Sequence, residues 1–132
     1  MRYMHDTDAV THLIKANPVL VKHVTATLMT DLCISAITKG ELLFGLPTRP
    51  AARQLHAAVT ESLKRVDVLP WNSNAAEHYG KLGASMEAQV DSLAPLDMLI
   101  GAHAASMGAV LVTNDQASKQ IGDLQVEDWT VA

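Results

Sequence analysis

Short apolar runs alternate along the chain with longer stretches in which apolar residues recur every three to four positions. The runs predict strands at residues 2–6, 32–35, 66–69, 110–113 and 125–130. The periodic stretches predict helices at residues 8–16, 18–27, 38–46, 50–66, 74–89 and 96–107, with a short helix from residue 116. Strands that alternate with helices indicate βαβ units. The predicted fold class is therefore α/β, with a mainly parallel central sheet flanked by helices on both faces.

Polar residues mark where several of these helices begin. Asn17 followed by Pro18 is typical of an N-cap and a first helical position. Asp8 suits the start of the first helix, and Thr38-Lys39-Gly40-Glu41 matches a capping box in which the glutamate bonds back to the cap. A favourable place at a helix start would equally explain Asp97 and Asp115.

Length and composition narrow the class of protein. The 132 residues predict one domain, residues 1–132, and no apolar run approaches the ~20 residues of a membrane span. The single cysteine, Cys33, lies in an apolar run and reads as a small buried hydrophobe, so no intrachain disulfide is possible. A reducing compartment, the cytoplasm, is the expected location.

Acidic residues follow or open apolar runs that lie far apart in the sequence. They are Asp6, Asp8, Glu41, Asp97 and Asp115. Capping alone explains Asp6 poorly, because it ends the first predicted strand. The carboxyl ends of parallel strands meet at one edge of a sheet, where ligands bind. Several carboxylates share one pocket only if a cation neutralises them, and oxygen ligands suit Mg²⁺ and Mn²⁺. The first interpretation is a divalent-metal enzyme that acts on phosphate esters.

The net charge of −4 argues mildly against a nucleic-acid partner. If the five acids gather at one metal site, nine acids remain against ten lysines and arginines. The rest of the surface would then be about neutral, and RNA is not excluded.

Four segments in order resemble PIN-domain ribonucleases, above all the VapC-type toxins. They are Met4-His5-Asp6-Thr7-Asp8, Ile34-Ser35-Ala36-Ile37-Thr38 leading to Glu41-Leu42, Ala94-Pro95-Leu96-Asp97, and Leu111-Val112-Thr113-Asn114-Asp115. The closing Glu127-Asp128-Trp129 also agrees, so the match spans nearly the whole chain. The resemblance implies a single PIN-like domain.

The resemblance also implies roles for the acids. Asp6, Glu41 and Asp97 would hold one or two Mg²⁺ or Mn²⁺ ions, and Asp115 would complete the cluster. The metal would activate a water for in-line attack on an RNA phosphodiester. Supporting contacts to the carboxylates or to phosphate are expected from Thr7, Asp8, Ser35 and Thr113.

Partners follow from the same resemblance. VapC-type toxins are held by a small VapB-type antitoxin whose tail covers the acidic pocket, and they commonly form homodimers. The complex usually binds its own promoter DNA through the antitoxin. Several relatives cleave tRNA and so inhibit translation. Apolar helix faces around Val10 with Leu13, and around Leu20 with Val24, are the expected contacts for a partner.

Two residues depart from the family pattern, and two other functions also stay open at this point. Asp8 stands where the family usually has asparagine, and Lys119 where it commonly has an aromatic residue. Asp6-Thr7-Asp8 also fits the D-x-D signature of haloacid-dehalogenase-like phosphatases, with Asp6 as nucleophile and Asp8 as acid/base. A catalytically silent interaction module, with the acids acting only as caps, is the third interpretation.

Overall fold

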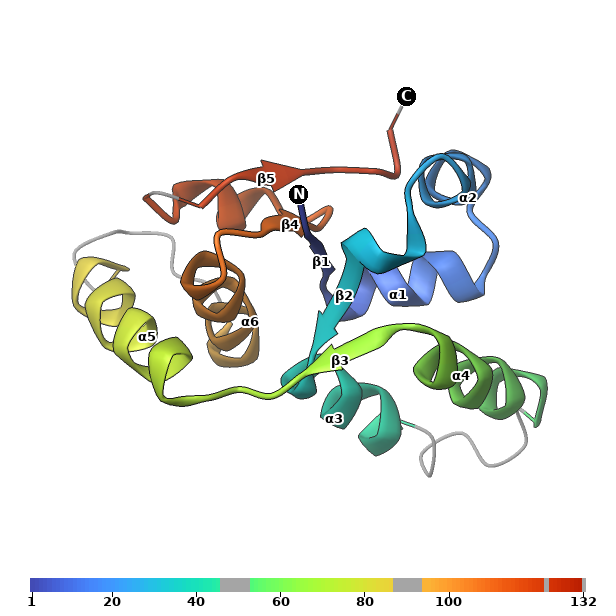
Figure 1. Cartoon of the computed structure of the whole chain (residues 1–132), viewed down its shortest axis with the longest axis horizontal. Coiled ribbons are helices and arrows are strands. Elements are labelled where there is room, and N and C mark those ends of the chain that lie inside the picture. Colours follow the sequence, from blue (N-terminus) through green and yellow to red (C-terminus); the bar gives the residue numbers. More distant parts are fainter. Residues whose placement is uncertain (46–52, 87–93, 123, 132) are drawn as a thin grey trace.

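The computed structural model describes residues 1–45, 53–86, 94–122 and 124–131. Within these ranges, five strands form one sheet in the order β3-β2-β1-β4-β5, and every neighbouring pair is parallel (Figure 1). The strands are β1 (Tyr3–His5), β2 (Leu32–Ser35), β3 (Asp67–Leu69), β4 (Val110–Val112) and β5 (Val126–Glu127). All five predicted strands are therefore present, although β5 is much shorter than the predicted 125–130.

Helices connect the strands and cover both faces of the sheet. They are α1 (Thr7–Ile14), α2 (Pro18–Thr25), α3 (Ala36–Gly45), α4 (Arg53–Arg65), α5 (Ser73–Met86) and α6 (Pro95–Ser106), with short 3₁₀ turns η1 (Met29–Asp31) and η2 (Gln116–Gln120). In Figure 1, α5 and α6 lie on one side of the sheet, and α1, α2 and α4 lie on the other. The predicted α/β class with two covered faces is confirmed.

Side chains that alternate along the strands fill two separate apolar layers. Met4 and Cys33 pack with Ile100 of α6 on one face. On the other face, Leu32 packs with Leu20 of α2, while Ile34 packs with residues of α1, α3 and α4. This alternation fixes the register of β1 and β2, because a slip of one residue would exchange the two layers. None of the helices in the described ranges is long and apolar enough to cross a bilayer.

The capping residues differ from two of the predictions. Asp6, rather than Asp8, is the N-cap of α1, and its Oδ1 accepts from the Ala9 N–H at 2.8 Å. The helix begins immediately after the strand, so the strand-end acid itself meets the free N–H groups. Asn17 does cap α2 as predicted, accepting from the Leu20 N–H at 3.0 Å.

The capping-box interpretation of Glu41 is also wrong. The helix α3 starts at Ala36, two residues earlier than predicted, and the Ser35 Oγ accepts from the Ile37 N–H at 3.1 Å. Thr38 consequently lies inside the helix and is buried. The predicted start of the 50–66 helix and the end of the 74–89 helix lie outside the described residues.

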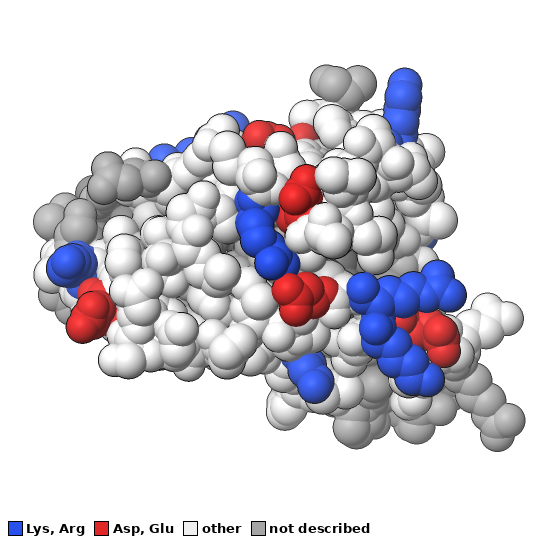
Figure 2. Space-filling view, in the orientation of Figure 1, with Lys and Arg blue, Asp and Glu red and all other residues white. Residues whose placement is uncertain are grey.

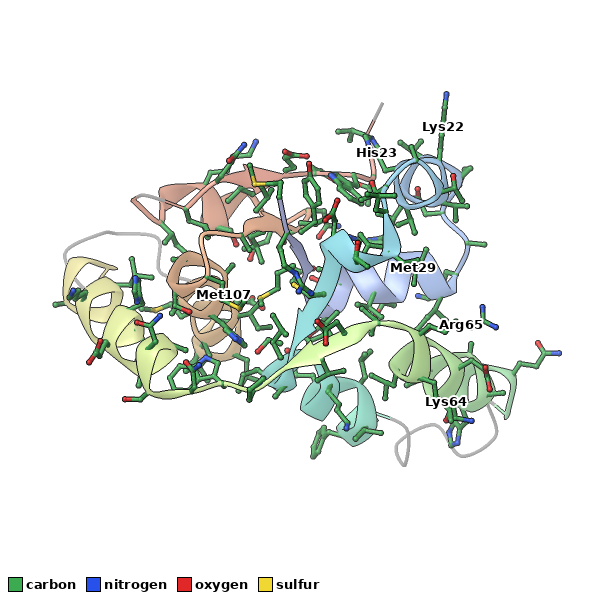
Figure 3. The ribbon with its side chains drawn as sticks, in the orientation of Figure 1. Lys22, His23, Met29, Lys64, Arg65 and Met107 are labelled. Atoms are coloured by element: carbon green, nitrogen blue, oxygen red, sulfur yellow. The ribbon has the colours of Figure 1, made fainter. Side chains whose placement is uncertain are left out.

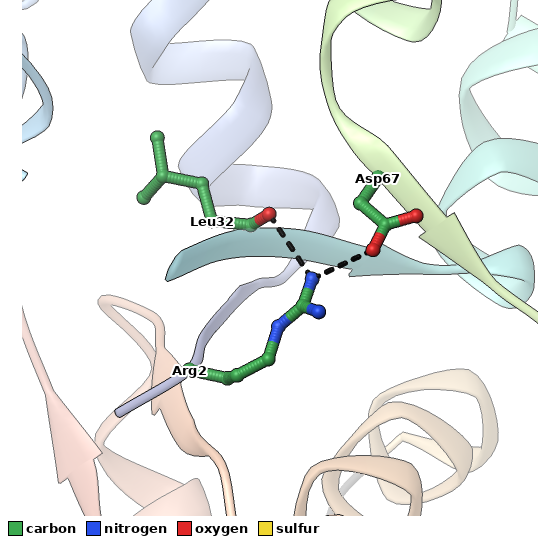
Figure 4. Close-up of polar contacts among 3 residues, drawn as sticks. All are labelled: Arg2, Leu32 and Asp67. Carbon is green, nitrogen blue, oxygen red and sulfur yellow. Dashed lines mark hydrogen bonds and ion pairs between the residues drawn. The ribbon is translucent and has the colours of Figure 1, made fainter. Parts of the chain in front are cut away.

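Arg2 ties the amino ends of three strands together. Its guanidinium donates to the Leu32 carbonyl at 3.4 Å and to the Asp67 carboxylate at 2.9 Å (Figure 4). These contacts join the chain before β1 to the first residues of β2 and β3. They hold the sheet at the edge opposite to its carboxyl ends.

Candidate metal centre

The carboxyl ends of β1, β2 and β4 bring polar residues together at one edge of the sheet. Asp6 follows β1, Ser35 ends β2, and Thr113 follows β4. The Asp6 N–H donates to the Val112 carbonyl at 3.0 Å, which fixes the end of β1 beside the end of β4. Parallel pairing of β1 with both neighbours therefore explains why residues so distant in sequence meet here.

Asp6 is the most buried of the predicted ligands. Only 6% of it is exposed. Burial raises the pKa of Asp6 to about 6, and the negative charges of Asp8 and Asp97 add to this effect. Hydrogen bonds from the Thr113 hydroxyl and the Ala9 N–H oppose the shift but do not cancel it. The surroundings of Asp6 thus disfavour its ionised form, and a nearby positive charge would favour it.

Asp97 connects the remaining acids to this position. It lies in the first turn of α6 and is half-buried. Burial raises the pKa of Asp97, and so do the charges of Asp115, Glu41 and Asp8, in that order. These charges come from the loop after β4, from α3 and from α1. The structure therefore brings all five predicted acids into one electrostatic cluster.

Glu41 is held by a residue from another helix. The Thr7 Oγ1 donates to the Glu41 Oε1 at 2.6 Å, which joins the start of α1 to the middle of α3. This hydrogen bond, rather than a cap, is the local role of the Glu41 carboxylate. The Thr7 hydroxyl thus contacts a carboxylate, as its expected supporting role requires.

Asp115 does cap the following turn. Its Oδ1 accepts from the Ala117 N–H at 3.0 Å, and its own N–H donates to the Thr113 Oγ1 at 3.0 Å. A carboxylate has two oxygens and about four acceptor positions, so a cap through Oδ1 leaves acceptor capacity for a cation. Capping and ligation are therefore compatible for both Asp6 and Asp115.

Ser35 has a partner that sequence reasoning missed. The Ser35 Oγ lies 2.8 Å from the Nδ1 of His103, and both residues are buried. Burial lowers the pKa of His103, which favours the neutral ring. The contact joins β2 to α6 across 68 positions. No local pattern in the sequence could have paired these two residues.

A second missed contact lies beside the acids. The Asn114 Nδ2 is 3.2 Å from the Nε2 of His12, at the last turn of α1. It places a histidine of α1 next to the loop that carries Asp115.

The donor set fits a hard divalent cation in its chemistry. All five acids offer carboxylate oxygens, the ligands that Mg²⁺ and Mn²⁺ prefer. Within the described residues, no group of three or more His, Cys, Asp or Glu side chains is disposed to hold a metal ion directly. Mg²⁺ usually keeps several waters and takes only one or two protein carboxylates directly, so the clustered acids fit such a partly hydrated ion.

Comparisons with known proteins give a consistent result. The family model described as "PIN domain" matches residues 3–124. A tRNA(fMet)-specific endonuclease VapC from Shigella flexneri is 30% identical, over 98% of this chain and 99% of that protein. Ribonuclease VapC1 from Haemophilus influenzae strain R2866 is 35% identical, over 98% and 99% respectively.

The comparison with solved structures points to the same group of proteins. The chain is similar to VapBC2 from Rickettsia felis bound to a promoter DNA fragment, with a TM-score of 0.89, 26% identity and coverage of 98% and 99% of the two chains. The DNA-bound VapBC of Salmonella typhimurium gives a TM-score of 0.89 at 31% identity, over 98% of each chain.

Proposed function

The chain belongs to the PIN domain family and, within it, to the VapC ribonucleases, and from this premise we propose that it is a metal-dependent endoribonuclease toxin. It hydrolyses RNA phosphodiester bonds, inhibits translation and is neutralised by a cognate antitoxin. The observation that carries the proposal is the position of Asp97, whose pKa is raised first by burial and then by carboxylates from three other segments. Such a cluster suits a divalent cation bound together with RNA phosphate.

The acids have different proposed roles in binding the ion. Asp6, Glu41 and Asp97 would be its main ligands, directly or through water, and Asp115 would complete the set. When bound, Mg²⁺ or Mn²⁺ lowers the pKa of a water for in-line attack and offsets charge on the leaving oxygen. Thr7 orients Glu41 through its 2.6 Å hydrogen bond. Thr113 orients both Asp6 and the backbone of Asp115.

Two residues depart from the family pattern, Asp8 in the first turn of α1 and Lys119 on η2. Asp8 adds a negative charge that raises the pKa of both Asp6 and Asp97, so we expect tighter cation binding than asparagine would give. Lys119 is exposed on η2, where an aromatic residue would be expected to pack, and it is available for an RNA phosphate.

The relatives support an antitoxin partner. The solved VapBC structures from Rickettsia felis and Salmonella typhimurium are complexes bound to DNA. We propose a VapB-type antitoxin for this chain, with promoter DNA bound through the antitoxin. The expected contacts need correction, because Val10 and Leu20 are buried in the core and so are not free to meet a partner.

Substrate, assembly and location complete the proposal. The name of the Shigella relative favours tRNA as the substrate. A homodimer is supported by the exposed apolar residues Leu43 and Phe44 on α3. The lone cysteine, with its buried thiol, suits the reducing cytoplasm.

The alternatives draw little support. A phosphatase would need Asp6 as an accessible nucleophile, but this carboxylate is nearly buried and caps α1. A silent interaction module, with the acids acting only as caps, does not account for Glu41, which accepts from the Thr7 hydroxyl in the middle of α3.

Incubation of the purified chain with total RNA tests the proposal, with Mg²⁺ or with a chelator. Asp6→Ala and Asp97→Ala are expected to abolish cleavage, and so is the chelator. Glu61→Gln is the matched control, because this exposed acid of α4 pairs only weakly with Lys64 and Arg65. Cleavage that survives the chelator or both substitutions would overturn the assignment.

A further inference from the structure

The contact between His12 and Asn114 lies beside the acid cluster but has no role in the proposed bond-breaking step. The His12 Nε2 is 3.2 Å from the Asn114 Nδ2, so the last turn of α1 meets the residue that precedes Asp115. His12 is half-buried and Asn114 is exposed. Among the residues that the structure describes, neither side chain has a further hydrogen-bond partner. Both side chains are therefore accessible to a molecule that is bound at the acids.

His12 continues a polar face of α1 that begins at the acid cluster. The charge of Asp8 raises the pKa of Asp6 and Asp97, so the first turn of this face lies among the acids. Residues four apart share a helix face, and His12 therefore follows Asp8 by one turn, about 5.4 Å along the axis. Lys15, the exposed C-cap of α1, follows on the same side three residues later. A strand of RNA bound at the acids would meet His12 and then Lys15 along this face.

The proposed reaction leaves the choice between RNA and DNA to binding. A water is the nucleophile, so the ribose 2′-hydroxyl takes no part in breaking the phosphodiester bond. The 2′-hydroxyl is nevertheless the group by which a protein distinguishes RNA from DNA at a given position. Selectivity for RNA therefore requires side chains that contact the ribose near the cleaved bond.

The chemistry of the His12 and Asn114 pair suits a hydroxyl. When the Asn114 Nδ2 donates to the His12 Nε2, the ring keeps an Nδ1–H donor, and the amide keeps one N–H donor and its oxygen acceptor. A hydroxyl both donates and accepts, so it can bond to both kinds of group at once. The ammonium group of Lys15 only donates, and it suits a phosphate instead.

We propose that His12 and Asn114 bind the ribose 2′-hydroxyl of a nucleotide next to the cleaved bond and so make the chain selective for RNA. This inference rests on the proposed function, because it requires the cleaved phosphate at the acid cluster. A neighbouring phosphate of the same strand binds Lys15. The pair determines specificity and takes no part in the chemical step.

A single-stranded RNA that contains a cleavage site mapped with the wild type tests the inference. Single 2′-deoxy substitutions are placed in turn at the nucleotides around the cleaved bond. One of them is expected to lower the wild-type kcat/KM about fivefold, the effect of one lost hydrogen bond. Asn114→Ala and His12→Phe are each expected to lower kcat/KM on the all-ribose RNA by a similar factor. Because the pair then no longer holds the hydroxyl, the same deoxy substitution should have little further effect in either variant.

Matched variants separate a ribose contact from a general loss of activity. His23→Phe is the control histidine, because His23 lies in the last turn of α2 (Figure 3) and stacks on Trp129 with ring centroids 5.2 Å apart. It should keep the full deoxy effect. Lys15→Gln should raise KM equally for ribose and deoxy substrates, because a phosphate contact carries no information on the sugar. His12→Phe leaves the chain next to Asp115 unchanged, so it decides the question if Asn114→Ala also disturbs that acid.

The outcomes distinguish this inference from the proposed function. A wild type that cleaves no RNA would overturn the proposed function. A wild type that cleaves RNA but tolerates every single deoxy substitution would overturn the ribose contact alone. The same holds if the deoxy effect persists at full size in both His12→Phe and Asn114→Ala.

Discussion

At the scale of single residues, burial shifts the pKa values of two neighbours at the end of β1 in opposite directions. Burial raises the pKa of Asp6 to about 6 and lowers the pKa of His5 to about 4. For Asp6, the shift corresponds to a cost of about 3 kcal/mol for the ionised form at neutral pH. In the function proposed above, a cation bound among the acids would offset this cost.

Asp6→Asn is expected to stabilise the metal-free protein while it abolishes RNA cleavage. Asparagine keeps an oxygen for the Ala9 N–H but carries no buried charge. The gain should not exceed about 3 kcal/mol, which corresponds to roughly 10 °C in Tm. Calorimetry with a chelator and with Mg²⁺ measures it, and Mg²⁺ should raise the Tm of the wild type only. A variant that is less stable than the wild type in chelator would contradict the argument, with Glu77→Gln as an exposed control.

The same two residues predict an unusual pH dependence of stability. The folded pKa of Asp6 lies above its ordinary value of 3.8, so its contribution is complete below about 4 and is lost as pH rises through about 6. The folded pKa of His5 lies below its ordinary 6.5, so its contribution is complete above 6.5 and is lost as pH falls through about 4. The two changes nearly cancel in the wild type, and Asp97, whose pKa is also raised, adds to the Asp6 side.

Removal of the Asp6 carboxylate should reveal the pH dependence of stability that His5 contributes. In Asp6→Asn the His5 contribution is no longer offset, so the variant should lose stability on acidification between pH 6.5 and about 4. The metal-free wild type should stay nearly level or gain. Urea unfolding in chelator across this range measures the difference. Parallel pH profiles for the two proteins would show that these residues do not control it.

At the scale of elements, the sequence predicts the order of strands and helices well, because these signals are local. The apolar run at Leu32 to Ser35 and the Asn17-Pro18 pair identify β2 and the start of α2 from their own residues. The start of α3 was misplaced because Thr38 and Glu41 imitate a capping box, while Ser35 supplies the actual cap.

The site contacts that the sequence did not predict join elements that lie far apart in the chain. The meeting of Asp6 with the end of β4 followed from the strand pattern, since carboxyl ends of parallel strands share an edge. Glu41 in α3 and Asp97 in α6 reach the cluster through the packing of helices on the sheet. The pairing of Ser35 with His103, and of Thr7 with Glu41, depends on how whole helices pack on the sheet. Periodicity and spacing carry no information on such packing.

Thr7→Val tests whether the contact between α1 and α3 positions the proposed metal ligands. The change removes the hydroxyl that donates to Glu41 and nearly preserves side-chain shape. We expect the Mg²⁺ concentration for half-maximal cleavage, and for thermal stabilisation, to rise severalfold. Thr11→Val is the matched control, because the Thr11 hydroxyl only bonds the Thr7 carbonyl within α1. Equal effects of the two substitutions would reduce Thr7 to a helix-stabilising role.

Gly101 tests how closely α6 must approach η2. A Cβ at this position would lie 2.7 Å from the Cδ1 of Ile121, a buried core residue. At Gly80 of α5, an added Cβ meets nothing within 4 Å. Both alanines gain helix propensity, so Gly80→Ala should stabilise by about 1 kcal/mol. Gly101→Ala should be less stable than Gly80→Ala by about 1–3 kcal/mol because of overpacking. Urea unfolding measures both, and equal stabilities would show that the core yields freely.

At the scale of the whole molecule, charged groups and exposed apolar residues are distributed differently over the surface. In Figure 2 the acidic and basic groups of the visible face are interspersed, and the basic group near the end of α4 includes Lys64 and Arg65 beside Glu61. No single-sign patch covers that face. Exposed apolar residues occur as adjacent pairs, Leu43 with Phe44 on α3 and Leu28 with Met29 at η1, and Phe44 is the most exposed of them at 79%.

The exposed end of α3 predicts how the chain self-associates. Burying an exposed phenylalanine and leucine against a second copy removes apolar area from water, which favours association by about 25 cal/mol per Å² before its costs. Phe44→Ser should therefore shift a homodimer towards the monomer in sedimentation velocity. Leu28→Ser removes an equally exposed residue from the segment before η1 and should leave the mass unchanged. A monomeric wild type would reject the homodimer itself. A Phe44→Ser variant that stays dimeric would assign the interface to a surface other than α3, and equal dissociation of both variants would show that the effect is not specific to α3. Because Glu41 lies on the same helix, an interface on α3 would connect assembly to the acid cluster.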